Sequence, residues 1–369
     1  MRIDFFPLKR FFLLASLGFA IGACSTTYLK YEKEDALKSN IEFEEAVQIQ
    51  EVPQEESTAK KSSVKLDEMG KDRTSLRLSP KSLPSSRKQL SPKPEPQNRS
   101  RKRLEKSGEA KKLSKSELQR EPSLEDSVGF QGRRPLVDPF RVGEKVIHNV
   151  HYFKVSAGTL TMTVDPFVQV NGRKSYSFVF DIETSNLFSK FYSVKDRARV
   201  LMDYEELVPR VYTLNVKETG QLREARSFFD FDKGIATFWE KKYTKKNGHE
   251  ERKETWEILP FSQNVFSAVH YMRVFQWDVG KEISFRVADD KQNLVFRGKC
   301  LRREKIKTDV GEFTALVIKP EFTLQGKFKP VGENLIWISD DDRKFILRIE
   351  SSIRIGTLVS EIVALEPGG

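Results

Sequence analysis

Apolar and polar residues alternate in short runs from Gly143 to Ala364. In the run 176–183 every second residue is Tyr, Phe or Ile, and in 347–355 Leu and Ile alternate mainly with Arg, Glu and Ser. A period of two residues indicates β-strands with one buried face and one solvated face. The pattern therefore predicts a sheet that packs only one of its sides on a core.

Turn-forming residues separate these runs. They include Asn171-Gly172, Lys233-Gly234, Asn247-Gly248, Asp289-Asp290, Val310-Gly311 and Asp340-Asp341-Asp342. Such residues supply positive φ angles or local side-chain hydrogen bonds in hairpins. We therefore expect consecutive strands to pair antiparallel.

One interior segment, Asn264 to Phe275, has helical spacing instead. Val265, Ala268 and Met272 would form an apolar stripe together with Val269, and Asn264 can cap the first turn. A one-sided sheet must cover its apolar face. For residues 139–366 we thus predict an all-β, mainly antiparallel fold: a curved sheet or partly open β-barrel with one helix on its concave face.

The N-terminus has the organisation of an export signal. Arg2, Lys9 and Arg10 precede an apolar run from residue 11 to residue 21, which is too short to span a bilayer. The run ends in Ile21-Gly22-Ala23-Cys24, which resembles the lipoprotein signal of bacteria. The resemblance implies that residues 1–23 are removed and that Cys24 receives acyl chains. Ser25 then favours the outer membrane, with the protein facing the periplasm.

Residues 24–138 show no sustained periodicity, and no aromatic residue occurs between Glu44 and Gly129. Such a segment cannot bury enough apolar surface to offset the entropy of ordering it. We predict a disordered tether rich in charged residues, Pro and Ser. A flexible chain of this length has a root-mean-square span on the order of 60 Å.

The basic charge of the chain is concentrated in the predicted tether. The net charge of the 369 residues is +11, and residues 71–120 alone contain 16 Lys or Arg and 5 Asp or Glu, which also gives +11. The cluster 99–103 has no interleaved aromatic residues for base stacking, and an export signal precedes it, so a nucleic-acid partner is not expected. The alternatives are a solvated linker, or contact with peptidoglycan, another anionic envelope polymer or lipid headgroups.

Cysteine usage excludes an intramolecular disulfide. With Cys24 acylated, Cys300 is the one remaining thiol of the sequence. The alternation in 294–300 places it on the apolar face of a strand. A buried, inert side chain is therefore expected at Cys300.

Several motifs in order along residues 143–364 resemble the bacterial domain of unknown function 3108 family of exported proteins. They are Gly143-Glu144-Lys145, Ala157-Gly158-Thr159-Leu160, Tyr192-Ser193-Val194-Lys195-Asp196, Asp203, Tyr271-Met272-Arg273, Gly311-Glu312-Phe313, Trp337-Ile338-Ser339-Asp340-Asp341 and Ile355-Gly356-Thr357-Leu358. This resemblance implies a β-rich envelope domain and carries no established activity. Gln263-Asn264 stands where an acidic residue would be expected. By looser analogy, the fold is similar to the half-barrel of the lipoprotein carriers LolA and LolB, whose apolar concave face holds acyl chains.

Candidate chemistry is sparse. His148 and His151 are three apart in a predicted strand, so their side chains point to opposite faces and make a poor metal pair. The sequence contains no nucleophile elbow, zinc-protease motif or phosphate loop. We expect no catalytic residue, cofactor or metal. Asp196, Asp203 and Arg273 remain as candidate polar positions, either in an ion pair that fixes sheet to helix or in a ligand site.

These features favour a non-enzymatic, lipid-anchored envelope protein. Its β-domain would bind a hydrophobic or amphipathic ligand, such as a lipid, or an envelope protein partner. The alternative is a structural or assembly protein whose basic tether contacts peptidoglycan. An enzyme is the third hypothesis, and it would require a pocket with converging titratable groups.

Overall fold

The computed structural model describes residues 39–52, 135–153, 155–324, 327–329, 334–353 and 356–369. The predicted signal peptide, Cys24 and most of the predicted tether, including its basic part, lie outside these ranges. In the described part of the chain, no helix has the length and apolar character needed to cross a membrane.

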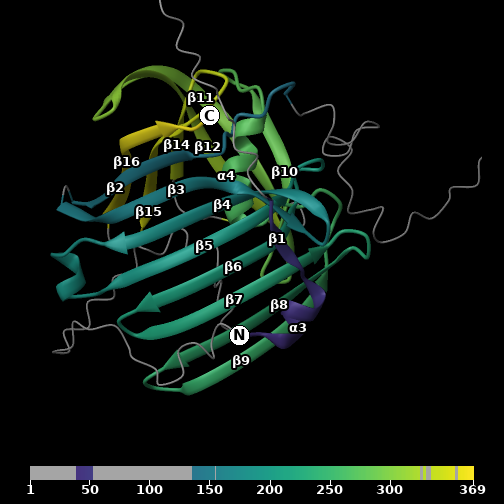
Figure 1. Cartoon of the computed structure of the whole chain (residues 1–369). Coiled ribbons are helices and arrows are strands. Elements are labelled where there is room, and N and C mark those ends of the chain that lie inside the picture. The colour runs from purple at the N-terminus through teal and green to yellow at the C-terminus, as the bar shows by residue number, and fades with distance from the viewer. Residues whose placement is uncertain (1–38, 53–134, 154, 325–326, 330–333, 354–355) are drawn as a thin grey trace, which may run out of the picture. The chain divides into compact units, whose positions relative to one another are not determined.

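Sixteen strands and two short α-helices make up the described structure (Figure 1). The strands are β1 (Ile49–Glu51), β2 (Glu144–Tyr152), β3 (Val155–Val170), β4 (Arg173–Thr184), β5 (Val194–Asp203), β6 (Pro209–Glu218), β7 (Gln221–Asp230), β8 (Ile235–Thr244), β9 (Gly248–Glu257), β10 (Glu282–Asp289), β11 (Gln292–Thr308), β12 (Gly311–Leu324), β13 (Lys327–Lys329), β14 (Asn334–Ser339), β15 (Ile346–Ile353) and β16 (Gly356–Pro367). The helices are α3 (Ile41–Ala46) and α4 (Val265–Tyr271), and two 3₁₀ turns are η3 (Phe188–Lys190) and η4 (Met272–Val274).

All sixteen strands belong to one sheet, and neighbouring strands pair antiparallel. The order is β10-β11-β12-β14-β15-β16-β2-β3-β4-β5-β6-β7-β8-β9, with β1 added to β3 and β13 to β12. The hairpin turns form as their residues require: Asn171 and Gly172 have φ angles of 49° and 79°. The predicted mainly antiparallel β-fold is confirmed.

The sheet curls but stays open, because its edge strands β9 and β10 do not pair with each other along the described chain. Side chains bridge part of this seam. Lys291 Nζ lies 2.6 Å from Glu254 Oε1, and Asn293 Nδ2 donates to the carbonyl oxygen of Glu257 at 3.0 Å. The segment before α4 also runs beside β10, where Gln263 forms a parallel bridge with Val287. A partly open barrel results.

Helix α4 begins at the predicted position. Asn264 is its N-cap: the Asn264 side chain accepts from the Ser267 N–H at 2.6 Å, and Ser267 Oγ accepts from the Asn264 N–H at 2.9 Å. This reciprocal capping satisfies two donors that would otherwise be left without partners. The α-helix ends at Tyr271, and one 3₁₀ turn, η4, continues it.

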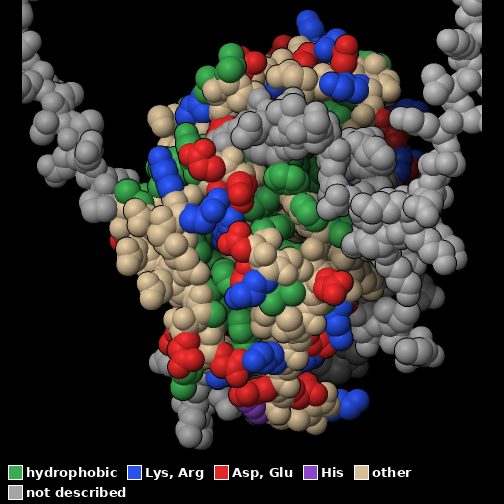
Figure 2. Space-filling view, turned by 90° about the vertical axis from the view of Figure 1, so that its right-hand side faces the viewer, with side chains coloured by type: hydrophobic (Ala, Val, Ile, Leu, Met, Phe, Trp, Pro, Cys, Tyr) green, Lys and Arg blue, Asp and Glu red, His purple; other side chains and the backbone are tan. Residues whose placement is uncertain are grey.

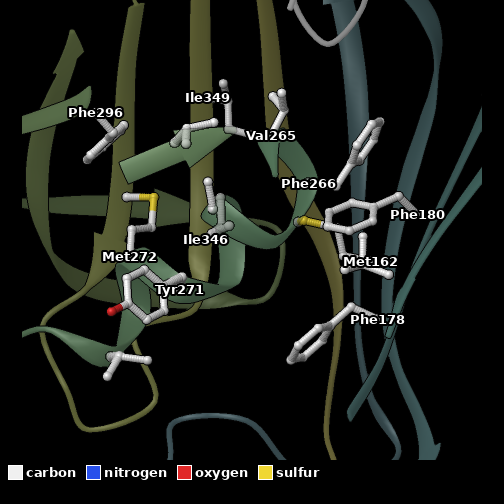
Figure 3. Close-up of a cluster of buried hydrophobic side chains, with 14 of the residues drawn as sticks. Met162, Phe178, Phe180, Val265, Phe266, Tyr271, Met272, Phe296, Ile346 and Ile349 are labelled. Carbon is white, nitrogen blue, oxygen red and sulfur yellow. The ribbon is translucent and has the colours of Figure 1, made fainter. Parts of the chain in front are cut away.

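The core lies between the two curled halves of the sheet, with α4 inserted among them (Figure 3). Phe178 and Phe180 of β4 contribute from one half, and Phe296 of β11 from the other. Phe266 and Met272, from α4 and η4, lie between them. The helix thus covers the concave apolar face that the sequence pattern predicted.

Residues 39–52 differ from the prediction, which had assigned them to the disordered tether. They form α3 and β1, and β1 pairs with β3. Phe43 and Val47 are buried against the outer side of the sheet, where Phe43 packs edge-on against Trp239 with a centroid distance of 5.8 Å. Two apolar side chains one helical turn apart are enough to dock this short element, although they are too few to produce a detectable periodicity.

Cys300 is buried, as predicted. It lies on β11 among the core residues, opposite Ile318 of β12. Burial is the largest influence on its thiol and raises its pKa. The thiol is therefore an inert part of the core at neutral pH.

Candidate functional site

A pocket with a volume of about 500 Å³ lies at one end of β3 and β4, beside the segment that leads into β2. Its walls include Asp138, Phe140, Phe167, Lys174, Tyr176 and Tyr204. This volume is in the range of small-molecule sites, on the order of 300–1,000 Å³. The pocket is therefore large enough for a ligand of modest size.

Three aromatic rings form one wall of the pocket. Phe167 comes from β3, Tyr176 from β4 and Tyr204 from the turn after β5. The ring centroids lie 5.0 Å apart for Phe167 and Tyr176, 5.6 Å for Phe167 and Tyr204, and 5.3 Å for Tyr176 and Tyr204. These spacings are typical of favourable aromatic pairs. Mutual packing thus holds the wall together before any ligand arrives.

Local chain features bring Phe167 to this wall. It follows Pro166 at a register shift between β3 and β4 that lies between Asp165 and Val168. Proline cannot donate to a sheet ladder and is tolerated at such irregularities. The bulge therefore accommodates Pro166 without an unpaired donor.

Lys174 is one of two basic side chains that line the pocket; the other, Arg141, donates to the carbonyl oxygens of Asp138 and Phe140. Its Nζ lies 4.0 Å from the ring centroid of Phe167 and 4.5 Å from that of Tyr204. In the part of the chain that the structure describes, no carboxylate forms an ion pair with Lys174. Ammonium groups over aromatic faces are attracted by the ring quadrupole. The ammonium is thus positioned by the rings and can still receive an anionic group.

A second wall, which adjoins the first at Tyr176, is the segment before β2. The Tyr176 hydroxyl donates to Asp138 Oδ2 at 2.8 Å, and both residues are largely buried. Phe140 packs edge-on against Tyr176 at a centroid distance of 5.2 Å and against Phe178 at 5.1 Å. The carboxylate of Asp138 is consequently engaged in holding the wall.

Asp203, one of the three predicted polar positions, supports the Tyr204 side of the pocket. Its Oδ1 accepts from the backbone N–H groups of Glu205 and Glu206, both at 2.9 Å, which shapes the turn that carries Tyr204. Its Oδ2 lies 2.5 Å from Arg173 Nε and 3.4 Å from Arg210 Nε. Burial acts to raise the pKa of this carboxyl, but the hydrogen bonds and the two guanidinium charges outweigh it and lower the pKa.

Arg273, the second predicted position, supports the Phe140 side. Its guanidinium forms a buried, bidentate ion pair with Glu144, with N–O distances of 2.6 and 3.0 Å. It also donates to the Pro139 carbonyl oxygen at 3.3 Å, and Arg343 donates to the same oxygen at 2.8 Å. The network ties η4 to the start of β2 and fixes the chain just before Phe140.

His270 contacts this network from the side of the core. Its ring stacks on Phe178 with a centroid distance of 4.0 Å, and Nδ1 lies 3.2 Å from Arg273 Nη1. Burial, followed by the charge of Arg273, places the pKa of His270 well below its ordinary value. The imidazole is therefore neutral, and its Nδ1 accepts the hydrogen bond from Arg273.

Asp196, the third predicted position, lies elsewhere. It is near the start of β5, opposite Ile182 and Val216, and its Oδ1 accepts from the Lys217 N–H at 3.2 Å. The ion pair expected among these three positions is replaced by others: Arg273 pairs with Glu144, and Asp203 pairs with Arg173 and Arg210. Asp203 and Arg273 support two walls of one pocket.

Sequence reasoning did not select the residues that face the pocket: Phe167, Lys174 and Tyr204. Each of them is an ordinary strand or turn residue in its local pattern. Their proximity depends on the register of β3, β4 and β5. Besides Asp203 and Arg273, the sequence signal that falls at this site is the predicted start of the β-domain at residue 139.

The arrangement suits binding. Rings offer apolar surface, Lys174 offers a cation, and the carboxylates of Asp138 and Asp203 are tied to structural partners. In the described ranges, no group of three or more His, Cys, Asp or Glu side chains could hold a metal ion. The residues match an amphipathic molecule with an anionic group.

Figure 2 views the molecule from the right-hand side of Figure 1. On this face apolar side chains lie in hollows between charged side chains of both signs. Where the residues of this face are described, charges of both signs interrupt one another, and no continuous basic stripe for a phosphate backbone is seen there.

Comparison with known proteins gives one family. A family model described as "Protein of unknown function (DUF3108)" matches residues 148–363. A search of the curated proteins found no match.

Solved structures that match this chain share little sequence identity with it. A β-barrel-like DUF1849 protein of Brucella abortus has a TM-score of 0.38 at 6% identity, covering 62% of this chain and 98% of its own. A protein of Bacteroides fragilis, assigned as exported and with a YmcC-like fold, has a TM-score of 0.29 at 10% identity, with coverages of 62% and 98%. A protein of Parabacteroides distasonis, assigned as a lipoprotein, has a TM-score of 0.25 at 10% identity, with coverages of 63% and 100%.

Proposed function

The chain belongs to the DUF3108 family of proteins of unknown function, and on this premise we propose that it is a non-enzymatic binding protein of the bacterial cell envelope. Its β-domain binds a small amphipathic molecule that carries an anionic group. Acyl chains on Cys24 anchor it to the outer membrane, on the periplasmic side.

One observation carries the ligand part of this proposal: the pocket of about 500 Å³ with an aromatic wall and the ammonium of Lys174. Apolar surface with a few oriented polar or charged groups is the usual composition of a small-molecule site. The rings would receive the apolar part of the ligand, and Lys174 the anionic part. Asp203 and Arg273 act as positioning residues that hold the two walls.

The anchoring part rests on the N-terminal sequence. A charged start, an apolar run and Ile21-Gly22-Ala23-Cys24 together support acylation of Cys24. Each buried methylene of an acyl chain contributes about 0.8 kcal/mol, so two or more chains anchor a protein stably.

Photo-crosslinking in cells tests the ligand part on the full chain. A photoreactive phenylalanine analogue replaces Tyr204 in the pocket wall or, as a matched control, Tyr243 on β8. After irradiation, peptide mass spectrometry should find a small-molecule adduct at position 204 and none at 243. Lys174→Gln should reduce the adduct severalfold, and Lys174→Arg should retain it.

The alternative outcomes of this experiment are informative. Crosslinks from position 204 only to another protein would indicate that this pocket binds a protein partner and not a small molecule. No adduct at 204, or equal adducts at 204 and 243, would overturn the proposal.

A second candidate function is favoured by one sequence observation, the net charge of +11 in residues 71–120. This segment would contact peptidoglycan or another anionic envelope polymer in an assembly role. Salt-sensitive co-sedimentation of the full chain with peptidoglycan tests it. Neutralising the basic residues of 99–103 should weaken the co-sedimentation, and an unchanged result would exclude the role of this cluster.

A further inference from the structure

Large apolar side chains are exposed together at the end of the sheet opposite the pocket. Phe153, in the turn between β2 and β3, is 68% exposed, and Val155, the first residue of β3, is 44% exposed. Leu187 is 54% exposed and Phe191 71% in the loop between β4 and β5. The described parts of this turn and this loop, residues 152–153, 155–156 and 184–192, are called the apolar rim below.

The turn and the loop of the apolar rim are neighbours. Strands β3 and β4 pair up to Gly158 and Thr184. Beyond that pair the Ser185 N–H donates to the Ala157 carbonyl oxygen at 2.8 Å, and Ser185 Oγ donates to that of Ser156 at 2.9 Å. In Figure 1 both lie at the left-hand ends of the strands. The exposed side chains therefore lie at the same end of the sheet.

The backbone holds these side chains outward. Phe153 has a φ angle of 47°, a left-handed conformation that is uncommon for a bulky residue. Its ring packs on that of Tyr152 at a centroid distance of 4.5 Å. Phe191 follows the turn η3 and donates its N–H to the carbonyl oxygen of Phe188 at 2.9 Å. Backbone strain that keeps a phenylalanine in water is a reason to look for a function there.

The described residues of the apolar rim carry a positive charge and no negative charge. Lys190 is exposed between Leu187 and Phe191, and the sequence of 184–193 contains no Asp or Glu. Exposed Phe and Leu flanked by Lys are typical of segments that lie in the interface of a membrane. Anionic headgroups attract basic residues near their surface.

We propose that the apolar rim docks into the headgroup layer of a phospholipid bilayer. The side chains sit on the tips of turns and are separated by Ser156, Ser185 and Ser189, which suits shallow insertion between headgroups better than a flat, continuous protein interface. The inference rests on the proposed function only for the acyl anchor that brings the domain to a membrane. It does not involve the ligand pocket.

Fluorescence of the full chain in vesicles of phosphatidylethanolamine and phosphatidylglycerol tests this inference. An environment-sensitive dye is attached to a cysteine introduced at Leu187 or, as a control, at Asp232 in the turn between β7 and β8. The control lies about 30 Å away, since ten strand residues separate the two ends. Peptide mass spectrometry confirms that Cys24 and Cys300 remain unlabelled.

The dye at position 187 should shift to shorter wavelength and be quenched by nitroxide-labelled lipid, and the dye at 232 should do neither. Combined Phe153→Glu and Phe191→Glu substitutions should abolish the shift at 187. Because both side chains are exposed, the melting temperature should not change.

Flotation of the chain with vesicles is measured separately. Flotation without a shift at 187 would overturn the docking of the rim and leave the anchor intact. Equal shifts at 187 and 232, or a shift that survives both Glu substitutions, would also overturn it. Crosslinking of position 187 only to a protein would assign the rim to a protein partner instead.

Discussion

Glu144→Gln is the most informative single test of the network that holds the pocket. Glu144 and Arg273 are each 2% exposed at the side chain, and their two N–O distances are 2.6 and 3.0 Å. Arg343 donates to the same carboxylate at 2.8 Å. The substitution preserves shape and leaves two guanidinium groups without their anion.

The expected effect is large because the pair is buried. Removing one partner of a buried ion pair costs about 3–5 kcal/mol, since the other charge stays desolvated. An exposed pair contributes about 0–1 kcal/mol. Lys195 and Glu183 form such a pair at 3.9 Å, with side chains 63% and 56% exposed. Glu183→Gln is therefore the matched control.

The assay is equilibrium unfolding of the full chain in urea, followed by tryptophan fluorescence. Glu144→Gln should lower the free energy of unfolding by about 3–5 kcal/mol, and Glu183→Gln by less than about 1 kcal/mol. Hydrogen exchange should also speed up in residues 138–141, because Arg273 and Arg343 would no longer be held against the Pro139 carbonyl oxygen. Equal losses for the two variants would refute the role given to this network.

Three further predictions concern the rest of the fold. Burial lowers the pKa of His148 from 6.5 to about 4. The neutral, buried ring therefore contributes its full stabilisation of the fold, about 3 kcal/mol, above pH 6.5, and this contribution is lost as the pH falls through 4. In urea titrations between pH 4 and 7, His148→Gln should make the free energy of unfolding less steep in pH, and an unchanged slope contradicts this. Gly158→Ala should destabilise the sheet by about 1–3 kcal/mol, because a Cβ there would lie 2.3 Å from the Glu183 carbonyl oxygen. Gly220→Ala, with open space around it, should change the melting temperature little, and similar melting temperatures for the two would be inconsistent with the tight packing at Gly158. Phe43→Ala should release α3 from the sheet and increase hydrogen exchange in residues 41–51 and not in β15, whereas uniform exchange would show that α3 is not a separate docked unit.

The sequence pattern was sufficient for the sheet and for α4, because both depend on local periodicity. Alternation identified the strands, and Asn264 with the stripe Val265, Ala268 and Met272 identified the helix and its first residue. The pattern did not reveal the short helix α3, because Phe43 and Val47 are buried only by packing against sheet residues that are distant in sequence, such as Trp239. Periodicity cannot report a contact of this kind.

The pocket was harder to predict than the fold. Asp203 and Arg273 were selected, yet their partners were not, because Arg173 and Glu144 are distant from them in sequence and neighbours only in the folded chain. Lys174 gave no signal, since a lysine after a hairpin turn is usually solvated. Its position over two rings follows from strand register and from the bulge at Pro166, which the residue pattern does not specify.

Native mass spectrometry of the full chain, extracted from its cell envelope, tests the central claim most directly. We predict a species heavier than the chain with its proposed acyl groups by the mass of one small amphipathic molecule. In a Lys174→Gln, Tyr204→Ala double variant this species should be reduced at least severalfold while the acylated chain persists. A parent protein that carries only its acyl groups, or an extra mass retained in full by the double variant, would contradict ligand binding in this pocket.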